Sequence, residues 1–207
     1  MWYSEIEELV NIHIPRRYFL CGATIKREGM ILIVSADASI KGCGCIKYFQ
    51  NPSALETSFA LSKSRIAPLQ KLTIPRLEMM ATNIAARSNY LKMLFKIKEG
   101  DIYCFSGSQI MVHRIKGSVN NWKPFVSNSF KEILNLIIPS PWQFYKGTEN
   151  PPDLVSRDAK LNDLINNKIW FQGPPWIMQG NFNYQRTKPI LNPNLSELSL
   201  EEQRQSK

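Results

Sequence analysis

Three carboxylates stand where they could act together on a metal-dependent reaction. Asp37 ends an apolar strand that begins with the run at 31–34, Glu78 lies early in a long predicted helix, and Asp153 lies early in another. Carboxylate oxygens are the ligands that Mg²⁺ and Mn²⁺ prefer. Each acid also has an ordinary interpretation, since Asp is common in turns and acids are favoured in the first turn of a helix. If the fold brings them together, we expect a divalent-metal site made of Asp37, Glu78 and Asp153.

A group of basic residues lies just before and within the start of the helix that carries Glu78. The chain has 26 Lys and Arg against 17 Asp and Glu, a net charge of +9, which permits binding to nucleic-acid phosphates. A solvated loop is the alternative interpretation. We predict phosphate contacts from Lys63, Arg65, Lys71 and Arg76. A second patch holds Trp122, for which packing on the domain is favoured over stacking on a nucleotide.

Other classes of protein are disfavoured by the composition. The four cysteines, Cys21, Cys43, Cys45 and Cys104, lack the spacing of a zinc module or a disulfide framework, so we expect reduced, partly buried thiols. No apolar run approaches the roughly 20 residues that a membrane-spanning helix needs. Glutamates at positions 5, 7 and 8 interrupt the start of the chain, which is unlike a secretory signal. We therefore expect a protein that is not secreted, has no membrane partner and resides in the cytoplasm or nucleus.

The hydrophobic pattern predicts the elements that must position these residues. Three strands come first, and strands and helices then alternate, in the order β-β-β-α-β-α-α-β-α, after a short helix carrying Ile6, Leu9 and Val10. That order is typical of an α/β fold with a mixed sheet flanked by helices. The strands are predicted near 31–34, 43–49, 57–61, 102–105 and 142–145; the helices at 74–96, with Thr73 as its cap, 110–115, 125–138 and from 150 onward.

Several longer motifs occur in an order that resembles one known family, the ribonuclease H-like domain of Bel-Pao type retrotransposon polyproteins. Asp37-Ala38-Ser39 resembles the family's strand-end Asp-Ala-Ser. The segments 62–69 and 73–78 resemble the stretch that carries its second acid. Further matches are Glu149-Asn150-Pro151-Pro152-Asp153-Leu154-Val155-Ser156-Arg157, Trp170-Phe171-Gln172-Gly173-Pro174-Pro175-Trp176 and Ile14-Pro15-Arg16.

The resemblance implies a ribonuclease H-like fold with a mixed five-stranded sheet, and a hydrolase that cleaves the RNA strand of an RNA–DNA hybrid. Asp37, Glu78 and Asp153 would be three of the four acids that hold two metal ions, Mg²⁺ or Mn²⁺. The domains would be a connection remnant at 1–29, the ribonuclease H-like domain at 30–160, a post-domain segment at 161–185 and a flexible tail at 186–207. The chain would be a fragment of a polyprotein.

The sequence departs from the family pattern at the fourth acid. Where the family has Ser-Asp-Ser after the fourth strand, this chain has Ser106-Gly107-Ser108, and glycine offers no ligand. Arg114 also replaces a family Trp in the following helix. We therefore expect weakened metal binding and strongly impaired cleavage. The alternatives are a non-catalytic nucleic-acid-binding module, a structural remnant, or a decayed reading frame. The sequence leaves the oligomeric state open.

Overall fold

The computed structural model describes residues 5–14, 17–19, 29–118, 122–138, 142–145 and 150–178. Its strands are β1 (Ile31–Ala38), β2 (Gly42–Asn51), β3 (Glu56–Ile66), β4 (Ile102–Ser106) and β5 (Trp142–Phe144). Its α-helices are α2 (Ile74–Arg87), α3 (Tyr90–Phe95), α4 (Gln109–Lys116), α5 (Pro124–Leu136), α6 (Pro152–Ser156), α7 (Leu161–Ile165), α8 (Lys168–Gln172) and α9 (Pro175–Met178), with short 3₁₀ turns η1 (Glu7–Asn11) and η2 (Glu99–Asp101).

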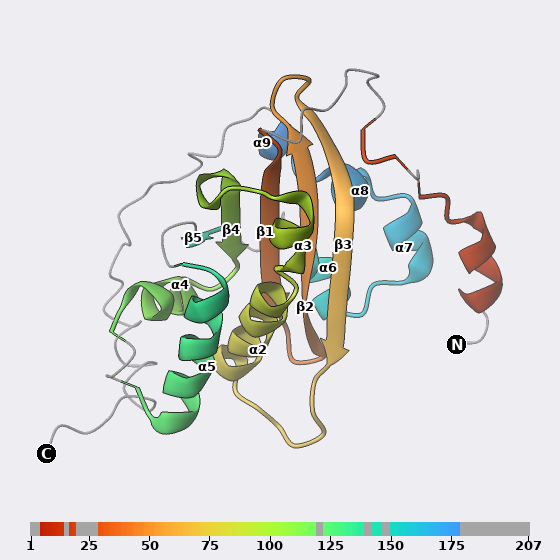
Figure 1. Cartoon of the computed structure of the whole chain (residues 1–207). Helices are drawn as coiled ribbons and strands as arrows, with labels where there is room; N and C mark the ends of the chain where they lie inside the picture. Colours follow the sequence, from red (N-terminus) through yellow and green to blue (C-terminus); the bar gives the residue numbers. More distant parts are fainter. Residues whose placement is uncertain are drawn as a thin grey trace, which may run out of the picture.

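The five strands form one mixed sheet in the order β3-β2-β1-β4-β5. The first three are an antiparallel meander, whereas β4 runs parallel to β1 and β5 runs parallel to β4. The carboxyl ends of β1 and β4 therefore lie at the same edge of the sheet, where α2 begins (Figure 1). The expected α/β class and the mixed five-stranded sheet flanked by helices are confirmed.

Each face of the sheet is covered by helices, because alternate residues along a strand point to opposite faces. On one face, Leu32, Val34 and Ala36 of β1 join a core closed by α2, α4 and α5. On the other, Ile31 and Ile33 join a smaller core that includes residues of α8 and α9.

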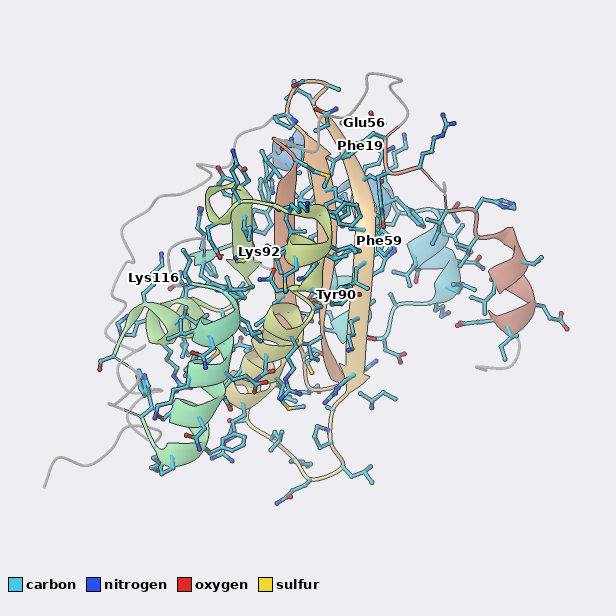
Figure 2. All side chains as sticks on the ribbon, viewed as in Figure 1. Phe19, Glu56, Phe59, Tyr90, Lys92 and Lys116 are labelled. Atoms are coloured by element: carbon cyan, nitrogen blue, oxygen red, sulfur yellow. The ribbon has the colours of Figure 1, made fainter. Side chains whose placement is uncertain are left out.

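The later helices complete the second face. Phe59 of β3, labelled in Figure 2, packs its ring against Trp170 and Phe171 of α8, at centroid distances of 5.9 and 6.2 Å. Trp176 of α9 lies on Phe105 of β4, at 4.7 Å. The Trp-rich motif is thus part of the domain's core, although the predicted division at residue 160 stays a prediction.

The helix predicted at 74–96 is two helices, which corrects the sequence-based expectation. Ser88 ends α2 because its hydroxyl donates to the carbonyls of Ile84 and Ala85 and so competes with the helical hydrogen bonds. Asn89 then donates from Nδ2 to the carbonyl of Leu136, at 2.8 Å. The other end differs as well, because Thr73 occupies the N-cap position of α2 but its side chain makes no capping hydrogen bond.

The structure says less about the predictions made for the two ends of the chain. The residues expected to form an apolar stripe near the start, Ile6, Leu9 and Val10, are exposed rather than packed on the sheet. The predicted tail at 186–207 lies outside the described residues, as do Cys21, Pro15 and Arg16. In the ranges that are described, we find no helix both long and apolar enough to cross a lipid bilayer.

Candidate functional site

The three predicted acids gather at the edge of the sheet where β1 and β4 end. Asp37 comes from β1, Glu78 from the first turns of α2, and Asp153 from the first turn of α6. Their charges interact, since both Asp153 and Glu78 raise the pKa of Asp37. The fold therefore brings together three residues that are separated by more than a hundred positions in the sequence.

Asp37 is the most perturbed of the three acids. The pKa of Asp37 is raised to about 7, first by burial and then by the charge of the neighbouring Asp153 carboxylate. A hydrogen bond from Ser156 Oγ to Asp37 Oδ2, at 3.2 Å, works against this rise by favouring the ionised form. Asp37 points to the α6 side of the sheet, the same side as Ile31 and Ile33, as its position in the strand predicts.

Buried polar contacts join α6 to β1. Asn150 is 2% exposed; its Oδ1 accepts from Ser35 Oγ at 2.8 Å and its Nδ2 donates to the carbonyl of Ala36 at 3.3 Å. Ser156, at the other end of α6, reaches Asp37, and its own carbonyl accepts from Ser39 Oγ. These contacts place Asp153 beside Asp37. The helix begins at Pro152, two residues later than the sequence predicted.

The other two acids already have protein partners. Asp153 pairs with Arg157 four residues later. Burial raises the pKa of Glu78, while a hydrogen bond from Ser108 and the charge of Arg114 lower it in part. Ser108 is the N-cap of α4, where its Oγ also accepts from the backbone nitrogen of Met111 at 3.3 Å.

Gly107, which stands where the resemblance implies a fourth acid, lies against Asp37. Its backbone nitrogen donates to the carbonyl of Ala36, at 3.3 Å. A Cβ placed on Gly107 would overlap Asp37 Oδ1 and would lie 3.4 Å from Asp37 Cγ and 3.5 Å from Asn150 Nδ2. The Asp37 carboxylate thus takes the space that a side chain at position 107 would need.

This arrangement does not fit the two-metal site that the resemblance implies. The oxygen donors have suitable chemistry for Mg²⁺, but Asp37 is packed against Gly107 and Asp153 is paired with Arg157. Within the part of the chain that the structure describes, no three His, Cys, Asp or Glu side chains form a group able to hold a metal ion. Of the cysteines, Cys43, Cys45 and Cys104 are free and buried, as expected.

Two of the four predicted phosphate-binding residues line a cavity of about 180 Å³ between β3, α2 and α5. These are Lys63 and Arg65. Arg76 lies near its wall, with its guanidinium 5.6 Å from the ring centre of Phe125, which also lines the cavity. Lys71 is exposed in the loop before α2 and is not a lining residue.

Sequence reasoning missed several residues around these two sites. Asn83 and Arg87 also line the cavity, where both bond to Glu132 of α5, and their spacing of four residues on one helix face was a usable signal. Arg114 was noted only as a departure from the family pattern. Trp122, for which packing was favoured, is 4% exposed and lies over Arg114, so that interpretation is confirmed.

A family model described as the Pao retrotransposon-like RNaseH-like domain matches residues 1–108. The chain belongs to this family. The match covers just over half of the chain and confirms the resemblance drawn from the motifs. It contains Asp37, Glu78 and Gly107 and ends before Asp153, so the ribonuclease H-like assignment rests on β1 to β4 and α2.

Solved structures show only distant likeness to this ribonuclease H-like domain. The LC11-RNase H1 isolated from compost by a metagenomic approach is 16% identical over 66% of this chain and 94% of its own, with a TM-score of 0.37. Two Ppx/GppA structures from Aquifex aeolicus are 13% and 12% identical, with TM-scores of 0.29 and 0.30. The chain spans about a third of the length of those two proteins, and no curated protein matches it. Likenesses this weak carry no conclusion about function.

Proposed function

We propose that this domain binds RNA–DNA hybrids and that its cleavage of the RNA strand is strongly impaired. The observation that carries the proposal is Gly107: the chain has a retroelement ribonuclease H-like fold with three acids at one sheet edge, but the fourth position holds glycine. Three acids, of which Asp37 and Asp153 already have protein partners, offer two metal ions too little negative charge and too few free oxygens. Weakened binding of Mg²⁺ or Mn²⁺ is part of the same proposal.

The support for nucleic-acid binding is the cation-lined cavity beside α2. Lys63 and Arg65 are exposed cations on β3, on the face of the sheet that α2 covers, and α2 also carries Glu78. Cations of this kind contact phosphates and position a strand without reading its sequence. Glu78 and the α2 residues that line the cavity, Met79, Met80, Asn83, Ile84 and Arg87, lie on the same helix.

Hybrid binding is tested by a salt series with matched charge variants. We expect Lys63→Gln/Arg65→Gln to bind a labelled RNA–DNA hybrid about tenfold more weakly and to lower the slope of log affinity against log salt by roughly two. The control, Lys160→Gln/Lys168→Gln, removes the same charge from exposed positions in the loop before α7 and on α8. An equal loss of hybrid affinity in both variants would show that the cavity does not contact the hybrid. If the wild type binds no hybrid, the alternative of a structural remnant is favoured.

Cleavage is tested with the same hybrid in Mg²⁺ and in Mn²⁺. We expect the wild type to release no more product than Asp37→Asn does. Turnover in the wild type that Asp37→Asn abolishes would show that three acids suffice, and would overturn the impairment. Binding without turnover would identify a non-catalytic nucleic-acid-binding module.

A further inference from the structure

The loop that joins β3 to α2 carries large apolar side chains that face solvent. Leu69 is 105% exposed, Ile66 at the end of β3 is 89% exposed, and Ile74 at the start of α2 is 40% exposed. The loop extends away from the sheet at the edge where α2 begins (Figure 1). Single apolar side chains on a surface are ordinary, but several gathered at one place mark a surface that contacts a partner.

The turn between β1 and β2 lies beside this loop. The backbone nitrogen of Ala67 donates to the carbonyl of Lys41 at 2.9 Å, and Gly42 pairs with Ile66 in the sheet. Ile40, which precedes Lys41 and is 77% exposed, therefore belongs to the same end of the sheet. We call the four exposed side chains at this end the apolar tip: Ile40, Ile66, Leu69 and Ile74.

The charge around the apolar tip is of one sign. The segment 62–77 contains four basic residues and no Asp or Glu, and Arg65 and Lys71, both exposed, flank Leu69 along the chain. This charge attracts polyanions, whereas a second copy of a chain with a net charge of +9 would be repelled. A nucleic-acid duplex offers what both features need, because two rows of phosphates border the apolar faces of its stacked bases.

The apolar tip lies close to the acids along α2. Ile74 and Glu78 are one helical turn apart, about 6 Å along the helix axis. Pro68, next to Leu69, fixes its own φ and so restricts the loop. Leucine, isoleucine and proline are among the side chains that proteins insert between base steps from the minor groove, with Arg and Lys nearby. The minor groove of an A-form duplex is wide and shallow, and so admits a loop of this kind.

We propose that Leu69 is an apolar wedge that unstacks a base step of the bound RNA–DNA hybrid from its minor groove, between phosphate contacts made by Arg65 and Lys71. The inference rests on the proposed function in taking the hybrid as the ligand. It adds a contact whose contribution to affinity does not depend on charge.

The affinity part is tested with a labelled hybrid in EDTA, over a salt series. We expect Leu69→Ser to bind about tenfold more weakly than the wild type, since an apolar side chain is no longer buried. The slope of log affinity against log salt should stay unchanged, because no charge is removed. The matched control is Leu55→Ser, the same substitution at the opposite end of β3, where Leu55 is 53% exposed. We expect it to bind like the wild type, and both variants to keep the wild-type melting temperature.

The unstacking is tested by the fluorescence of 2-aminopurine placed in the DNA strand of the hybrid. At saturating protein we expect the wild type and Leu55→Ser to raise the fluorescence, and Leu69→Ser to lose most of that rise. Equal affinity and equal fluorescence in Leu69→Ser and the wild type would overturn the wedge alone. No hybrid binding by the wild type would overturn the proposed function and the wedge with it.

A lipid surface is the other partner that apolar and basic side chains could fit, so the same variants are sedimented with vesicles of phosphatidylcholine and phosphatidylserine. We expect Leu69→Ser and the wild type to sediment equally. If Leu69→Ser loses vesicle binding but keeps the fluorescence rise, the apolar tip contacts lipid and the wedge is wrong.

Discussion

Gly107 has no side chain, and the space beside it holds the carboxylate of Asp37. A glycine where the family pattern has an acid therefore does more than omit a side chain, because the neighbouring carboxylate of Asp37 fills the volume. Asp37 is half-buried, and its carboxylate also accepts a hydrogen bond from Ser156 Oγ. Any larger residue at 107 must displace it.

The first prediction concerns Gly107→Ala. The new methyl group overlaps Asp37 Oδ1, so we expect the free energy of unfolding to fall by about 1–3 kcal/mol in chemical denaturation. Gly100→Ala is the matched control: nothing lies within 4 Å of its Cβ, and we expect a change within about 0.5 kcal/mol. Asp37→Ala should relieve the clash, and an equal loss from Gly107→Ala in that background would contradict the explanation.

A second prediction at this scale follows from the raised pKa of Asp37. Because the folded state holds this proton up to a pKa of about 7, against an ordinary value near 3.8, the stability that it contributes is complete below pH 4 and is lost as the pH rises toward 7. Asp37→Asn removes the ionisation. We expect the variant to gain on the order of 1–3 kcal/mol relative to the wild type between pH 4 and pH 8, in metal-free denaturant titrations. A stability difference independent of pH would show that Asp37 titrates normally.

At the scale of elements, α6 is a five-residue helix whose position depends on side-chain contacts with β1. A helix this short has little stability of its own. Asn150 and Ser156 make those contacts from its two ends, and α6 in turn carries Asp153. The position of α6 against β1 thus decides where Asp153, the third acid, lies.

The third prediction is that Asn150→Ala destabilises the domain by about 2 kcal/mol. The change leaves the hydroxyl of Ser35 without its acceptor and removes a donor to the carbonyl of Ala36, both in the buried region. Asn166→Ala is the control, because Asn166 is exposed and, among the described residues, its side chain bonds to the carbonyl of Asn162, one turn earlier. Similar losses in the two variants, measured by denaturant unfolding, would argue against the contact between α6 and β1.

At the scale of the whole molecule, two helical layers enclose the sheet, and one of the two cores holds a charge. Lys47 of β2 is fully buried on the α2 side, in the row of paired residues that continues through Val34 to Cys104. Its Nζ has no hydrogen-bond partner among the described residues. Burial lowers the pKa of Lys47 to about 8, which means that the larger core carries an electrostatic cost.

The fourth prediction is that Lys47→Met stabilises the domain by about 1–3 kcal/mol at pH 7. The unfolded chain keeps the ordinary pKa near 10.5, so between pH 8 and pH 10 the unfolded wild type binds more protons than the folded form, and its stability rises. The advantage of the Met variant should therefore shrink as the pH approaches 10. Lys131→Met, at an exposed position of α5, is expected to show no such trend. A constant advantage across this pH range would mean that Lys47 stays normally charged.

Much of this domain follows from local sequence. Alternation and β-branched residues determined the strands, the 3.6-residue period determined α4 and α5, and the order of elements determined an α/β mixed sheet. The motif order identified the family. These inferences succeed because strand and helix periodicity are local, and because the motifs follow one another in a fixed order. A shared metal site for Asp37, Glu78 and Asp153 stays a prediction, although the charges of Asp153 and Glu78 act on Asp37.

What the sequence missed depends on contacts between distant segments. The break at Ser88 was hidden because the apolar period continues across it, and the deciding hydrogen bonds need the folded geometry. The overlap of Asp37 with the space beside Gly107 joins residues that only packing brings together. The sequence by itself determined the family, the fold class and the glycine at the position where the family pattern has an acid. Tertiary structure decided that the carboxylate of Asp37 fills the space beside this glycine, because volume and burial are properties of the packed chain.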